Sequence, residues 1–349
     1  MKKKLLAAVT VLTLLLGLTA CSPQKTEVKK REASFLTLFD TVTTVVGYAE
    51  SDESFKQSVQ SLHDDLQSYH QLFDIYNDYD GVNNIKSIND NAGIKPVKVD
   101  KRIIDLLSFA KEVYVFTNGK VNVAMGSVLS IWHNYRTEGI DNPQTAKIPP
   151  VQELEAAAKL TDINKVIIDG ENSTVFLEDK GMSLDVGAIA KGYAVQRVCE
   201  AAKDRGIDRF LISVGGNVSS IGAKSVEGDP WVVGIQSPYD AEEYQHTVFI
   251  NDAKSVVTSG NYQRFYTVDE VKYHHIIDPV TLMPANNFDA VTIICGDSGL
   301  ADALSTALYV MSLEDGRALI ESIDNAEAVW VVDGGTEIYS SGFESYIRT

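Results

Sequence analysis

The sequence predicts an α+β fold in which helices pack against a mixed, mostly antiparallel sheet. From Lys165 onward the chain is rich in short apolar strand patterns, and helical patterns interrupt them without a regular β-α-β alternation. Asp169 and Gly170 add a hairpin signal, because they separate apolar runs at residues 166–168 and 174–177. These observations favour an α+β class over a Rossmann-type parallel sheet.

The N-terminal half combines one strand pattern with two helices. Residues 35–48 are rich in Thr, Val and Phe and predict a strand that is irregular near Phe39. Apolar residues recur every three or four positions from Phe55 to Phe73, which predicts an amphipathic helix. Asp100 is placed to cap a second helix. Two polar stretches are expected to lie outside regular structure, a surface loop and a polar insertion: residues 77–91 and 136–150.

The C-terminal half predicts a helix that ends at Gly206, a series of strands and two further helices. The expected strands are residues 209–214, 231–236, 247–250, 264–268, 273–277, 290–295, 328–332 and 337–340. The expected helices near the end of the chain are residues 300–311 and 313–323.

Residues 183–193 form the central motif of the sequence, and the other candidate site residues are interpreted in relation to it. Asp185 ends an apolar run and Gly187 follows it, after which a helical apolar spacing begins at Ala188. The stretch therefore predicts a strand, a tight turn and a helix start, where unpaired N–H groups attract anions. A carboxylate on that turn would repel a bare phosphate unless it binds a sugar, a ring nitrogen or a metal.

The first 20 residues have the pattern of a signal peptide, with a basic start and an apolar core. The four residues that end at Cys21 resemble the lipobox of bacterial lipoproteins, in which the cysteine is acylated. We expect Cys21 to carry a lipid anchor, residues 21–34 to form a flexible tether and residues 35–349 to form one catalytic unit. An ordinary secretory signal is the alternative.

Charge and cysteine content limit the possible partners. The formal net charge is −17, and removal of the three leader lysines changes it to −20. Such an acidic chain is a poor nucleic-acid binder and would not adhere electrostatically to anionic lipid. We expect Cys199 and Cys295 to be buried thiols. Because the charge gives no attraction to lipid, membrane contact should come from the lipobox cysteine. The sequence therefore predicts a protein anchored by lipid to the extracytoplasmic face of a bacterial membrane.

Several side chains outside residues 183–193 suit phosphate chemistry. Asp302 and Thr306 are four residues apart on an expected helix, so they share one face and offer oxygen ligands suited to Mg²⁺. Arg264 could clamp a phosphate or carboxylate, and His275 is a candidate proton acceptor beside an Asp-Pro turn. Each residue alone has an ordinary structural explanation, such as a helix cap, a surface ion pair or a structural histidine.

Six motifs occur in the order of one family, and together they resemble the FAD:protein FMN transferases of the ApbE family. The motifs are Ser-Leu-Asp-Val-Gly-Ala-Ile-Ala-Lys-Gly-Tyr193, Ser-Val-Gly-Gly-Asn217, Trp-Val-Val-Gly-Ile-Gln236, Thr-Ser-Gly-Asn-Tyr-Gln-Arg264, His-Ile-Ile-Asp-Pro279 and Ala-Asp-Ala-Leu-Ser-Thr-Ala307. The resemblance runs from about Phe35 to the C-terminus and implies a single flavin transferase domain.

The resemblance implies transfer of the FMN moiety of FAD to a Thr or Ser hydroxyl of an acceptor protein, with release of AMP. The implied Mg²⁺ ligands are Asp302, Thr306 and the main-chain oxygen of Ala188, and His275 matches the family's proposed base. The positions that match FAD contacts are Phe39, Tyr76, Lys120, Val121, Asn122, Asp185, Lys191 and Ile277. The family expectation for the acceptor is a subunit of a membrane electron-transfer complex.

The chain departs from the family pattern at three places. Phe39-Asp40 stands where Met-Gly is common, Asn122 where Asp is common, and Leu282 where Gly is common. Two other functions compete with transfer: an FAD pyrophosphatase that releases FMN and AMP, and a non-catalytic flavin-binding lipoprotein. A binding protein has no need of Asp302 and Thr306 one turn apart, so this pair favours catalysis.

Overall fold

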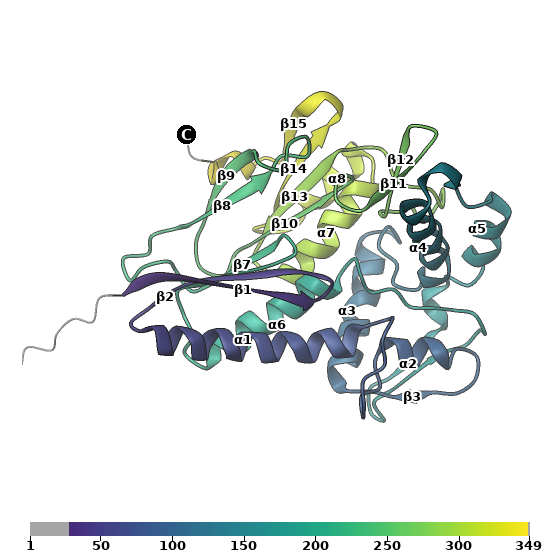
Figure 1. Cartoon of the computed structure of the whole chain (residues 1–349), viewed down its shortest axis with the longest axis horizontal. Coiled ribbons are helices and arrows are strands. Elements are labelled where there is room, and N and C mark those ends of the chain that lie inside the picture. The colour runs from purple at the N-terminus through teal and green to yellow at the C-terminus, as the bar shows by residue number, and fades with distance from the viewer. Residues whose placement is uncertain (1–27, 348–349) are drawn as a thin grey trace, which may run out of the picture.

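A computed structural model describes residues 28–347, and an eight-stranded sheet runs through them (Figure 1). Each neighbouring pair of strands in this sheet is antiparallel, which confirms the predicted α+β class. In spatial order the strands are β1 (Lys29–Leu38), β2 (Thr41–Ala49), β6 (Phe210–Val214), β7 (Asn217–Ile221), β10 (Ser255–Gly260), β13 (Ala290–Cys295), β14 (Glu327–Val332) and β15 (Thr336–Tyr339).

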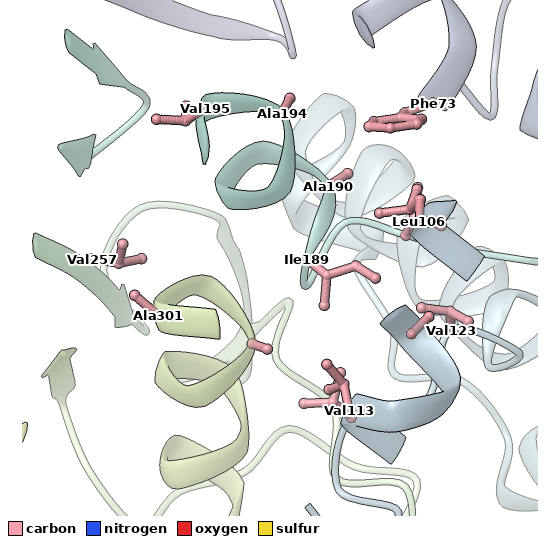
Figure 2. Close-up of a cluster of buried hydrophobic side chains, with 14 of the residues drawn as sticks. Phe73, Leu106, Val113, Val123, Ile189, Ala190, Ala194, Val195, Val257 and Ala301 are labelled. Atoms are coloured by element: carbon pink, nitrogen blue, oxygen red, sulfur yellow. The ribbon is translucent and has the colours of Figure 1, made fainter. Parts of the chain in front are cut away.

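Three helices cover one face of this sheet and form the main core with it: α1 (Asp52–Phe73), α6 (Ala190–Asp204) and α7 (Ser298–Val310). Ser51 and Ser54 form a capping box that starts α1, and the side chain of Asp297 caps α7. Figure 2 shows that Ile189, just before α6, points into the apolar side chains between α6, α7 and α3 (Lys101–Phe116). The start of α6 is therefore held inside the core.

The other face of the sheet is covered by the hairpin of β8 (Trp231–Gln236) and β9 (Tyr244–Ile250). Trp231, Val233 and Ile235 point from β8 into a second apolar cluster with the sheet. All six residues of β13 are buried, because this strand has neighbours on both faces. The molecule is thus layered, with helices, the large sheet and the hairpin stacked in that order.

A helical lobe lies beside the large sheet at the right of Figure 1. Its elements are α2 (Ile85–Asp90), α3, α4 (Gly126–Asp141), α5 (Val151–Ala158) and the small sheet of β3 (Val97–Lys98), β5 (Thr174–Leu177) and β4 (Val166–Asp169). The remaining strands and α-helix are β11 (Phe265–Val268), β12 (Val271–His274) and α8 (Leu313–Glu321). Asp100 caps α3 as predicted.

The structure corrects several expected elements. Residues 35–48 are not one strand but the two arms of the β1–β2 hairpin, and β1 begins at Lys29, inside the predicted tether. The expected loop at 77–91 contains α2, whose Asn84 forms a capping box with Ser87. The expected insertion at 136–150 begins with the last turns of α4.

Two more corrections concern the strands that flank the site. The apolar run before Asp185 is not a strand of a sheet, because it makes only one parallel bridge, between Met125 and Ser183. The side-chain amide of Asn89 holds this run instead, accepting from the N–H of Leu184 and donating to its carbonyl. The strand expected at 273–277 ends at His274.

Residues 1–27, which include Cys21 and the predicted signal peptide, lie outside the described residues. In residues 28–347 no helix is both long enough and apolar enough to span a bilayer. Cys199 and Cys295 are free thiols; Cys295 is buried as predicted, whereas Cys199 is only partly buried.

Candidate active site

A cavity of about 320 Å³ lies where the β1–β2 turn, α4, α6 and α7 meet. Residues far apart in the sequence reach it from each of these elements. The structure places thirteen of the sequence-predicted site residues on its walls: Phe39, Tyr76, Lys120, Val121, Asn122, Asp185, Ala188, Lys191, Arg264, His275, Ile277, Asp302 and Thr306.

Asp302 joins α6 and α7 at the floor of the cavity. It lies on α7 with 5% of its surface exposed, and its Oδ2 accepts a hydrogen bond of 2.8 Å from the N–H of Gly192. That N–H belongs to the first turn of α6, which lacks a side-chain cap of its own, so Asp302 supplies the cap from the neighbouring helix. A Cβ on Gly192 would lie 2.2 Å from the carbonyl oxygen of Ser298, so glycine is required for this close approach.

Asp185 forms the turn that leads into α6. Its Oδ1 accepts the N–H of Gly187 at 2.8 Å, and its own N–H donates to the carbonyl of Val123. These bonds place the turn against the segment that carries Lys120, Val121 and Asn122. Asn122 in turn holds its own loop, because its Oδ1 accepts the N–H of Ala124 and its Nδ2 donates to the carbonyl of Thr161.

Two carboxylates face the cavity without an ion-pair partner: Asp302 is buried and Asp185 is partly buried. Burial raises the pKa of both Asp185 and Asp302, which means that neither carboxylate is fully compensated by protein groups. Neither takes part in an ion pair within 4.0 Å among residues 28–347. A bound cation would relieve this cost, so the floor of the cavity suits a metal ion.

The two adjacent histidines have different roles in the structure. His274 is structural, because its Nε2 donates to the carbonyl of Ala285 at 2.7 Å and its Nδ1 accepts the N–H of Ile276. His275 faces the cavity, and its buried Nδ1 has no hydrogen-bond partner. Burial, together with the charge of Arg264, lowers the pKa of His275 to about 3. The imidazole is therefore neutral at neutral pH and able to accept a proton.

Three cations surround the cavity without a carboxylate partner. Lys191, Arg136 and Arg264 all line the cavity, and none of them forms an ion pair among the described residues. Burial, and then the charge of Arg264, lowers the pKa of Arg136, as expected for two nearby guanidinium groups. Lys120 differs, since its Nζ lies 3.7 Å from a carboxylate oxygen of Asp278. Unpaired cations in so acidic a chain indicate an anion-binding site.

Arg136 and His133 are cavity residues that the sequence analysis missed. Both lie on α4, and Nη2 of Arg136 donates to Nδ1 of His133 at 3.0 Å. The ring of His133 also lies 5.4 Å from that of Tyr76. A helical spacing of Met125, Leu129, Trp132, His133 and Arg136 could have revealed this face, because all five side chains line the cavity.

The comparisons with known proteins agree with one another. A sequence model of the ApbE family matches residues 39–330. A protein of Klebsiella pneumoniae (strain 342) named FAD:protein FMN transferase is 33% identical over 281 residues, which span 78% of this chain and 83% of that protein. A crystal structure of the ApbE protein from Thermotoga maritima has a TM-score of 0.79 at 29% identity and covers 92% of this chain and 100% of that one. The chain belongs to the ApbE family.

Proposed function

We propose that this protein transfers the FMN moiety of FAD to a threonine or serine hydroxyl of an acceptor protein and releases AMP. The observation that carries the proposal is the cavity itself, in which a neutral imidazole, unpaired cations and a buried, unpaired carboxylate meet. The family supports it, because the relatives from Klebsiella pneumoniae and Treponema pallidum are both named FAD:protein FMN transferase.

The reaction forms one bond to phosphorus and breaks another. The acceptor hydroxyl oxygen bonds to the phosphorus of the FMN moiety, and the bond from that phosphorus to the AMP phosphate breaks with its electron pair leaving on AMP. His275 takes the hydroxyl proton at a ring nitrogen, which its neutral state allows. Burial is the main cause of the low pKa of His275 and nearby cations such as Arg264 add to it; the negative diphosphate of FAD would offset the part due to the cations and so make the imidazole a stronger base.

We propose that Mg²⁺ is held by Asp302, Thr306 and the main-chain oxygen of Ala188. All three residues line the cavity, and a carboxylate, a hydroxyl and a carbonyl are the oxygen donors that hard cations prefer. The unpaired, buried carboxylate of Asp302 fits this assignment. When bound, the ion would neutralise charge on the phosphate oxygens.

The remaining walls suit the flavin ring system and the cofactor's phosphates. Phe39, Tyr76 and Ile277 give the cavity an apolar and aromatic side, as expected for a site that holds planar rings. Arg136 and Arg264 can donate several hydrogen bonds to phosphate oxygens in a fixed geometry. We propose that the two guanidinium groups bind the diphosphate.

An Arg136→Gln variant is expected to bind FAD about 10- to 100-fold more weakly, because one charge-assisted contact to the diphosphate is lost. Affinity for riboflavin, which has no phosphate, should stay unchanged, so titrations of both ligands provide the test. Arg317→Gln is the matched control, since Arg317 is an exposed residue of α8 outside the cavity. Equal weakening for riboflavin and FAD would contradict this role of Arg136.

We propose that acylated Cys21 anchors the enzyme to the extracytoplasmic face of the membrane, where its acceptor would be a membrane electron-transfer subunit. The lipobox supports this location. A Cys21→Ser variant is expected to leave the membrane fraction or remain unprocessed, because it has no thiol to acylate. Its turnover with FAD should equal that of the wild type, since Cys21 lies outside the ApbE match. Membrane retention of a fully cleaved variant, measured by fractionation and mass spectrometry, would refute the anchor.

A further inference from the structure

The turn between β1 and β2 has an unusual backbone at the cavity wall. Leu38 pairs with Thr41, so Phe39 and Asp40 alone form the turn, and their φ angles are 53° and 52°. Thr37, just before the turn, has a φ of 97°. Residues with side chains rarely adopt this left-handed region, and glycine or asparagine is usual in such a turn. The surrounding structure must therefore hold the turn in place.

A chain of hydrogen bonds from α1 holds this turn. The N–H of Phe39 donates to Nδ1 of His70 at 3.2 Å, and the two rings meet edge to face with centroids 5.6 Å apart. Nε2 of His70 lies 3.2 Å from the hydroxyl of Tyr79, which donates to Oδ2 of Asp74 at 2.7 Å. Since Nδ1 accepts a hydrogen bond, the proton of neutral His70 lies on Nε2, and this N–H donates a hydrogen bond to the hydroxyl of Tyr79.

The same chain ends on the loop that carries Tyr76. Asp74 is buried, and its carboxylate accepts the N–H of Tyr76 at 2.6 Å and that of Asn77 at 3.1 Å, as well as the Nδ2 of Asn77. Burial alone would raise the pKa of Asp74, but these bonds and that from Tyr79 lower it, so the carboxylate stays charged. Tyr76 itself is 52% exposed at the cavity wall.

We infer that His70, Tyr79 and Asp74 are positioning residues that set Phe39 and Tyr76 for the planar ring system of bound FAD. One continuous network fixes the backbone of both aromatic residues, although they come from different segments of the chain. Phe39 and Tyr76 line the cavity beside His70 and Asp74, whereas Tyr79 does not line it and links those two residues from behind. This inference rests on the proposed function, because FAD is the ligand whose rings they would contact.

A Tyr79→Phe variant tests the inference, because it removes the hydroxyl that links His70 to Asp74. Flavin binding is measured by fluorescence titration and ADP binding by calorimetric titration, both without an acceptor protein. We expect affinity for both FAD and riboflavin to fall about 10-fold, and affinity for ADP, which lacks the flavin ring, to stay unchanged. The turnover number at saturating FAD should change little, so the loss appears in KM. Tyr244→Phe is the control, since Tyr244 is 71% exposed on β9.

A second pair of variants separates positioning from folding. His70→Ala removes the acceptor for the N–H of Phe39. In His70→Asn the amide oxygen can accept this N–H in place of Nδ1, so riboflavin should bind more tightly to His70→Asn than to His70→Ala. Nitrogen NMR of labelled histidine should find His70 in the Nε2–H form, and Tyr79→Phe should weaken that preference.

Unchanged riboflavin affinity in Tyr79→Phe would overturn the inference. So would an equal loss for ADP and riboflavin together with a lower urea midpoint, because that pattern reports general destabilisation. If the wild type bound no flavin at all, the proposed function would fail instead, so the two failures are distinguishable.

Discussion

Asp302→Ala is expected to abolish FMN transfer, lowering turnover by roughly 10³-fold or more, because it removes the one carboxylate assigned to Mg²⁺. FAD binding should weaken less, since the apolar and aromatic wall supplies much of the affinity. The rate of AMP release in the presence of FAD, Mg²⁺ and an acceptor measures the first effect, and equilibrium titration measures the second. An active Asp302→Ala enzyme would rule out this metal assignment.

A structural explanation for that loss must be excluded, because Asp302 also caps the first turn of α6 through Gly192. Asp302→Asn keeps an oxygen that can accept this N–H and removes only the charge. It should fold with a near-normal urea midpoint and still be inactive. Asp297→Asn is the matched control, since Asp297 also caps a helix, in its case α7, which carries Asp302, but it does not line the cavity.

His275→Ala is expected to slow transfer by about 10²-fold or more if His275 accepts the proton of the acceptor hydroxyl. The affinity for FAD should change little, because the imidazole acts on the acceptor rather than on the flavin. Single-turnover measurements at saturating FAD and acceptor isolate this step from binding. His274 is no substitute base, since both of its ring nitrogens are already hydrogen-bonded. Transfer at the wild-type rate would contradict the assignment.

The pH dependence of stability provides an independent test of His275. Its pKa is about 3 in the folded protein, against 6.5 for an ordinary histidine. Between these values the unfolded chain binds a proton that the folded chain does not, so this residue lowers the stability progressively as the pH falls below 6.5. His275→Gln should therefore lose less stability than the wild type between about pH 7 and pH 5, as measured by urea unfolding. Parallel curves would show that His275 is not buried as a neutral group.

Residues with local signals were predictable from the sequence. Asp100 precedes a helical apolar pattern and caps α3, and β13 has the predicted bounds because a run of six residues, apolar except for Thr292, is buried on both faces. Thirteen residues to which the motifs or the family resemblance pointed line one cavity, although one motif, residues 231–236, lies in the β8 hairpin away from it. The geometry that joins them, such as the cap that Asp302 supplies to α6, depends on tertiary packing and leaves no local signal.

The structure explains why glycine is common in the family at two of the three positions where this chain departs from the pattern. Asp40 and Leu282 stand where the family has glycine, and both have a left-handed backbone with φ of 52° and 61°. The absence of glycine at Phe39-Asp40 also explains why residues 35–48 resembled one strand. A Phe-Asp turn lacks the usual glycine or asparagine signal, and the hydrogen bond from Phe39 to His70 that supports it spans 31 residues.

Arg136 was missed for a different reason. The polar residues that follow it hide the end of α4, and its importance comes from neighbours on other segments, such as Arg264 and Asp185. No spacing within residues 136–150 indicates that these neighbours lie close by.

In the proposed reaction FMN passes to a protein hydroxyl rather than to water. The most direct measurement incubates the enzyme with FAD and Mg²⁺, with and without a candidate acceptor, and follows both AMP release and the mass of the acceptor. We predict slow AMP release from FAD alone, because a transferase must leave water unactivated until the acceptor docks. With an acceptor bearing a suitable threonine, release should be much faster and the acceptor should gain the mass of one FMN. Rapid AMP release that is unchanged by the acceptor, with no gain in mass, would make the protein an FAD pyrophosphatase.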